Sequence, residues 1–157
     1  MLCLADLAPG AAAALLDRHD LKLRVVADGA TIPGSYWGEP EAGIIGSNVY
    51  ARADTPVHSL LHEACHVIVA PAGKRESIHT DASESQAEED AACYLQILLA
   101  DELPGAGRAR LMADMDAWGY TFRLGSTRAW FEYDAQDARA WLAARQLLPL
   151  AGVAACG

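Results

Sequence analysis

The first third of the chain carries strand-like patterns of apolar and polar residues. Three runs are typical of β-strands, namely Leu21 to Ala27, Ser35 to Trp37 and Gly43 to Tyr50, and the first alternates apolar with polar side chains. Turn-forming residues around Pro33 and Pro40 separate them. We therefore expect a small antiparallel sheet.

A helical period replaces this pattern after residue 55. From Val57 to Ile68 the apolar residues recur every three to four positions, Pro56 suits the first turn, and Pro71 ends the run. Further helices are expected over 11–17, from about 84 or 87 to 99, and over 108–118, 127–133 and 135–148. Because the strands precede most of the helices, the sequence predicts an α+β fold, organised as one domain over residues 1–157.

His62, Glu63 and His66 form the motif HExxH inside the expected helix over 57–68. Residues four apart on a helix project about 40° from one another, so both imidazoles can bind one tetrahedral metal ion. A zinc ion held in this way lowers the pKa of its bound water, and Glu63 lies near enough to take the proton. The motif predicts one Zn²⁺ ion, bound by His62 and His66, with Glu63 as general base in the hydrolysis of a peptide or protein amide bond.

A third protein ligand is expected, because catalytic zinc usually has three of them and a water. The residues after His66 lack the third histidine of the metzincins. On the following helix, Glu88 shares an apolar stripe with Leu95 and Leu99 that should face the motif helix. Glu88 is therefore favoured as the third ligand, and Glu89 is the alternative. The other candidates are His58, His79, Asp81, Glu84 and Asp90.

The order of these features resembles the gluzincins, and within them the ImmA/IrrE family of small bacterial zinc peptidases. That family combines a β-hairpin, a strand ending near an Asn, HExxH, and a helix of the form ExEANxFAxxLL. The matching segments here are IIGSN at 44–48, HEACH at 62–66 and EEDAACYLQILL at 88–99, with Ala92 in place of the Asn. The resemblance covers about residues 20–104. It implies a minimal zincin-like fold with a helical C-terminal part, Glu88 as the metal ligand, and a substrate-pairing strand near Gly43 to Tyr50.

Gluzincins often stabilise the tetrahedral oxyanion with a His or Tyr that does not bind the metal. His79 is our candidate for this role, and thus a second catalytic residue beside Glu63, with Tyr120 as the alternative. Asp81 or Asp90 could orient a metal-bound imidazole.

The composition of the chain mainly argues against certain partners and kinds of site. The formal charge is −9, from 21 acidic and 12 basic side chains, and the basic residues are scattered, which argues against a nucleic-acid partner. No apolar run approaches the ~20 residues of a membrane span, and the N-terminus lacks the pattern of a signal peptide, so we expect a cytoplasmic protein with no membrane partner. The four cysteines form no CxxC pair, which excludes a zinc ribbon.

Two alternatives to a peptidase remain open. A closed site with four protein ligands would indicate a non-catalytic, zinc-stabilised regulatory or binding module. A small-molecule hydrolase could use the same zinc chemistry. In the leading interpretation the partner is a peptide or protein substrate, and the oligomeric state and cleavage specificity stay undetermined.

Overall fold

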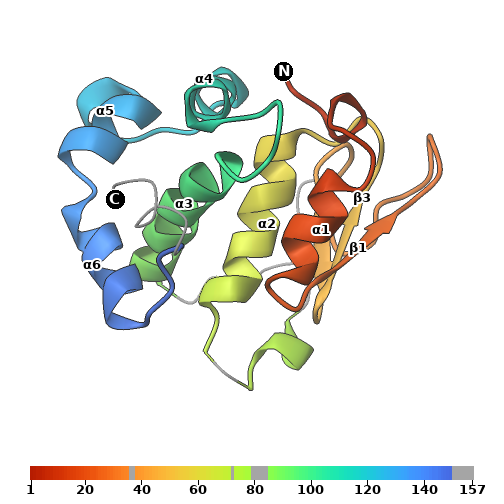
Figure 1. Ribbon diagram of the computed structural model, residues 1–157, viewed down its shortest axis with the longest axis horizontal. Helices are drawn as coiled ribbons and strands as arrows, with labels where there is room; N and C mark the ends of the chain where they lie inside the picture. The colour runs from red at the N-terminus through yellow and green to blue at the C-terminus, as the bar shows by residue number, and fades with distance from the viewer. Residues whose placement is uncertain (36–37, 72, 79–84, 150–157) are drawn as a thin grey trace.

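The computed structural model describes residues 1–35, 38–71, 73–78 and 85–149. The elements follow in the order η1 (Leu4–Asp6), α1 (Ala11–Asp17), β1 (Lys22–Val25), β2 (Gly43–Ile45), β3 (Asn48–Ala51), α2 (Val57–Val69), η2 (Arg75–Ser77), α3 (Gln86–Ala100), α4 (Arg108–Trp118), η3 (Arg123–Gly125), α5 (Thr127–Tyr133) and α6 (Gln136–Ala144). Figure 1 shows α1 and the sheet on one side of α2, with α3 on its other side and α6 beyond α3. This arrangement confirms the α+β class.

The sheet is mixed rather than antiparallel. Its strand order is β1-β3-β2, with β3 in the middle. The expected strand over 43–50 is a hairpin of β2 and β3 that turns at Gly46, where φ is +61°. β1 pairs with β3 in parallel, with Val25 opposite Ala51. The expectation of an antiparallel sheet is therefore wrong for β1, because the long connection over 26–47 lets the chain return in the same direction.

Most of the expected helices agree with the structure. The bounds of α1, α4 and α5 are as predicted, whereas α6 ends at Ala144 rather than at Leu148. Helix α3 begins after Ser85, whose Oγ accepts a hydrogen bond from the backbone N–H of Glu88 at 3.1 Å. At 15 residues, α3 is the longest helix in the described parts of the chain. No helix there is long and apolar enough to cross a membrane.

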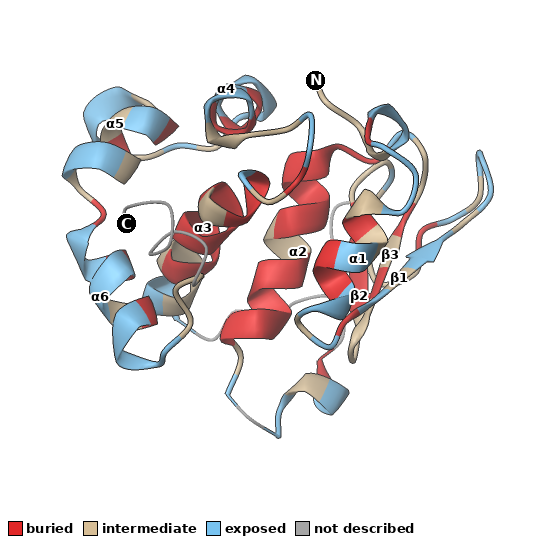
Figure 2. Ribbon diagram, viewed as in Figure 1, coloured by how far each residue is buried: buried red, intermediate tan, exposed pale blue. Residues whose placement is uncertain are grey.

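Helix α2 occupies the centre of the fold and is buried on almost every side. It packs against α3, α4, β2 and β3, and Figure 2 shows most of its ribbon as buried. A helix covered on all sides is expected to be apolar all round. Within α2, which the structure describes in full, His62 and Glu63 are the two residues that are not buried. The HExxH motif is therefore the part of α2 that the neighbouring elements do not fully bury.

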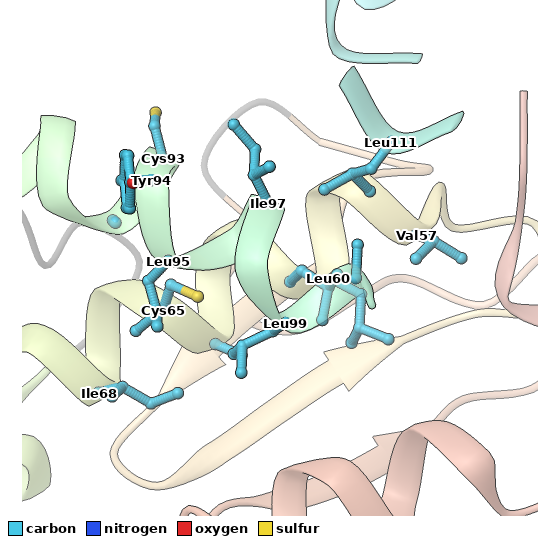
Figure 3. Close-up of a cluster of buried hydrophobic side chains, with 14 of the residues drawn as sticks. Val57, Leu60, Cys65, Ile68, Cys93, Tyr94, Leu95, Ile97, Leu99 and Leu111 are labelled. Atoms are coloured by element: carbon cyan, nitrogen blue, oxygen red, sulfur yellow. The ribbon is translucent and has the colours of Figure 1, made fainter. Parts of the chain in front are cut away.

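The core lies between α2 and α3. Figure 3 shows side chains from both helices, including Leu60 and Cys65 of α2 and Leu95 and Leu99 of α3, gathered in one cluster. Leu60 is fully buried, and Leu95 and Leu99 are each 1% exposed. This apolar contact fixes how the two helices lie against one another.

Leu99→Ala should lower the free energy of unfolding by about 2–5 kcal/mol, because it leaves a cavity between the helices. Leu98→Ala is the matched control: the same change one residue earlier on α3, at a half-buried position, should cost clearly less. Urea denaturation of both variants measures the difference. Equal losses would contradict this assignment of the core face.

Candidate metal centre

Three side chains from two helices converge beside the part of α2 that is not fully buried. The Nε2 atom of His62 lies 3.1 Å from Oε1 of Glu89, and the Nε2 atom of His66 lies 2.9 Å from Oε2 of the same carboxylate. The two Nε2 atoms are 3.0 Å apart. Potential ligand atoms of all three residues lie within 4.8 Å of one another. The structure thus brings both predicted histidines together with an acidic group from α3.

The donor set fits a divalent cation. Two imidazole nitrogens 3.0 Å apart cannot both direct a proton at each other, so at least one presents a lone pair. Zinc–ligand bonds of about 2.0–2.2 Å place tetrahedral ligand atoms roughly 3.3–3.5 Å apart, slightly more than the separations here. Two imidazoles and a carboxylate are ligands that Zn²⁺ accepts, although the set also suits other divalent ions.

The acidic member of the cluster is Glu89, the alternative, rather than the favoured Glu88. The apolar stripe of α3 favours Glu88, but the stripe that contacts the histidines is formed by Glu89, Cys93 and Gln96. The Cys93 Sγ lies 4.0 Å from His62 Nδ1. Because α3 is buried on several faces, its apolar stripe does not identify the face that meets α2. Glu88 belongs to the first turn, where its N–H contributes to the helix cap.

The pKa values of His62 and Glu89 depend strongly on their contact with one another. Burial alone would lower the pKa of His62, but Tyr120, Cys93 and Glu89 together raise it well above the ordinary value. Burial would likewise raise the pKa of Glu89, but its hydrogen bonds with His62 and His66 lower it below the usual range. Without a metal, the cluster therefore favours an imidazolium beside a carboxylate. A zinc ion would supply the positive charge in place of that proton.

Gln96, which the sequence did not single out, contacts His62 from the interior. Its side chain is fully buried, and its Oε1 lies 2.6 Å from Nδ1 of His62. The amide nitrogen donates to the backbone carbonyl of His58 at 3.2 Å. The spacing of Glu89, Cys93 and Gln96 at i, i+4 and i+7 on a buried helix was the available signal for this residue.

Glu63, like its neighbour His62, is only partly buried. Burial raises the pKa of the Glu63 carboxyl, His62 and His66 lower it, and Glu41 and Glu89 add to the rise. The net effect is a pKa above the ordinary value, which makes the carboxylate a better proton acceptor. Glu41 approaches from the segment before β2 and accepts a hydrogen bond from Trp118 Nε1 at 2.9 Å.

The aromatic side chains of Tyr120 and Trp118 lie close to the histidines of α2. His58 is 1% exposed, its Nδ1 lies 3.2 Å from the Tyr120 hydroxyl, and its ring lies 5.0 Å from that of Trp118. The Tyr120 ring is also 5.7 Å from the His62 ring. Burial and the nearby His62 lower the pKa of His58 to about 4, so it is neutral near pH 7. Tyr120, the alternative candidate for oxyanion stabilisation, therefore lies beside the metal cluster.

The remaining predicted site residues are His79, Asp81, Glu84 and Asp90. His79, the favoured candidate for oxyanion stabilisation, lies outside the described residues, as do Asp81 and Glu84. Asp90 accepts a hydrogen bond from Gln86 at 2.8 Å, within the first turns of α3.

The strand expected to pair with substrate has its outer edge partly occupied. Gly43 of β2 forms an antiparallel bridge with Ser35 on the side away from β3. Just beyond the end of β2, the Gly46 N–H donates to the Ile78 carbonyl at 2.8 Å. Backbone pairing with a peptide at this edge remains a prediction, and it is restricted to the part between these two contacts.

Replacing the carboxylate on each of two neighbouring residues distinguishes the two glutamates. Glu89→Ala should weaken zinc binding by more than the ~10–100-fold that loss of an outer contact costs. Glu88→Ala, the same change one position earlier, should leave the dissociation constant within a few-fold of the parent. Competition with a chromophoric chelator measures both. A larger loss in Glu88→Ala would mean that Glu88, not Glu89, binds the metal.

Comparison of the chain with models of protein families, with curated proteins and with solved structures finds no match in any of the three. The resemblance to the ImmA/IrrE peptidases therefore depends on the sequence motifs alone. What the structure adds is the cluster of His62, His66 and Glu89 at metal-binding distance.

Proposed function

We propose that this protein is a zinc-dependent hydrolase of peptide or protein amide bonds, with His62, His66 and Glu89 as metal ligands and Glu63 as general base. One observation carries the proposal: two Nε2 atoms 3.0 Å apart share one carboxylate, beside the Glu63 of the same motif. Two imidazoles and one carboxylate are ligands that a catalytic zinc ion accepts.

Zinc bound here would polarise a carbonyl group and make water acidic enough to lose a proton near neutral pH. The residues of the chain supply the rest of the chemistry. Glu63 accepts the proton of the attacking water and returns it to the nitrogen of the leaving amine. Its raised pKa suits both transfers, because a carboxylate of low basicity would be a poor acceptor.

Within the described part of the chain, the number of candidate ligands suits a catalytic zinc site. Among the described residues, three groups form the cluster, whereas a closed structural zinc site usually has four protein ligands. The Cys93 sulfur lies 4.0 Å from Nδ1 of His62 and 3.9 Å from Oε1 of Glu89, and it is not one of these three groups. Three ligands leave a coordination position for water or substrate.

Glu63→Gln tests the role of the carboxylate. The variant should retain one zinc per chain, because Glu63 is not a ligand, and should lose at least ~100-fold in turnover of a quenched fluorescent peptide library. Glu88→Gln, the same change at a glutamate of α3 outside the cluster, should keep its activity. Unchanged turnover in Glu63→Gln would remove Glu63 from the mechanism.

Metal removal distinguishes an enzyme from a zinc-stabilised module. Chelation should abolish hydrolysis and leave the helical circular dichroism signal in place, because α2 and α3 are joined by an apolar core that needs no metal. Added zinc should restore activity. Unfolding on chelation would support the alternative of a structural zinc site.

A further inference from the structure

Gln96 is a polar side chain in the most deeply buried part of α3. It is 0% exposed, with Leu95 and Ile97 on either side exposed by 1% or less. A buried amide destabilises a protein unless its oxygen and nitrogen both find hydrogen-bond partners. Gln96 has both: the Nδ1 atom of His62 at 2.6 Å and the carbonyl oxygen of His58 at 3.2 Å.

These two contacts fix which way the amide points. The carbonyl of His58 can only accept a hydrogen bond, so the amide NH₂ must face it. The amide oxygen then faces His62 and can only accept, so Nδ1 of His62 must carry a proton. The other nearby acceptor, the Cys93 sulfur, is 4.0 Å from Nδ1 and cannot compete with an oxygen at 2.6 Å. With its proton on Nδ1, a neutral His62 presents the lone pair of Nε2 to Glu89 and His66.

The second histidine of the cluster has no comparable contact. The Nδ1 atom of His66 is buried and has no hydrogen-bond partner among the described residues. The orientation of the two imidazoles is therefore controlled unequally, and Gln96 provides the hydrogen bond that holds one of them from behind.

We propose that Gln96 is a positioning residue, which holds His62 in the tautomer that directs Nε2 at the metal. Gln96 is not one of the proposed metal ligands, and its amide oxygen contacts the ring of a ligand, His62. The inference rests on the proposed zinc site and identifies how that site is prepared before the ion arrives. Outer contacts of this kind typically change metal affinity by about 10–100-fold.

Gln96→Met and Gln96→Glu form the central comparison. Methionine has a similar length but no oxygen acceptor, so zinc should bind about 10–100-fold more weakly. Glutamate keeps an acceptor oxygen for Nδ1, and in its protonated form also a donor for the His58 carbonyl, so its zinc dissociation constant should stay closer to that of the parent than in Gln96→Met. Leu95→Met, a volume-conserving change at the neighbouring buried residue, should leave zinc affinity unchanged. Equal loss in all three variants, or no loss in Gln96→Met, would overturn the proposal.

The tautomer can also be read directly in the unaltered protein. Long-range ¹H–¹⁵N correlation spectra of the zinc-loaded chain should show a protonated, hydrogen-bonded Nδ1 on His62, and this signal should shift in Gln96→Met but not in Leu95→Met. A proton on Nε2 of His62 would refute the role of Gln96 even if every variant failed to fold. If the parent protein binds no zinc, the proposed function fails; if it binds zinc without responding to Gln96, the positioning role alone fails.

Discussion

The apolar contact between α2 and α3 determines the geometry of the cluster formed by His62, His66 and Glu89. The two histidines come from α2 and the carboxylate from α3, so their distances depend on how one helix is rotated against the other. Neighbouring residues on a helix point about 100° apart, so a rotation of that size would exchange Glu89 for Glu88. The buried leucines on both helices hold this rotation in place. Packing thus prearranges the three side chains, so a metal ion bound there would not have to order the chain first.

Burial also determines which side chains in and behind the cluster are charged and which are neutral. His62 and Glu89 sit at the boundary between the core and solvent, and each shifts the other toward its charged form. Gln96 and His58 behind them are neutral and fully or almost fully buried. The charged pair of His62 and Glu89 therefore lies on the solvent side of two neutral, hydrogen-bonded side chains, Gln96 and His58. This separation is favourable, because an isolated charge in the interior would be costly, whereas a neutral amide with both partners costs little.

Much of this arrangement could be predicted from the sequence, and the failures have identifiable causes. The helices over 11–17, 108–118 and 127–133 have strong local signals, and HExxH places two histidines on one face of a helix by geometry alone. The cluster contains Glu89 rather than the favoured Glu88, and periodicity could not distinguish them because α3 is apolar on more than one face. The parallel pairing of β1 depends on a long connection whose path no local pattern encodes. Gln96 was passed over because a single glutamine in a helix is usually a surface residue.

The two unburied residues of α2 have a further consequence for how such a protein can change over evolutionary time. His62 and Glu63 lie in the one part of the central helix that the core does not enclose, so substitutions of Glu63 need not disturb the packing that keeps the chain folded. Loss of the Glu63 carboxylate would therefore leave an intact framework around His62, His66 and Glu89. The reverse step is equally short, since a chain with this framework needs only one carboxylate to regain a proton acceptor.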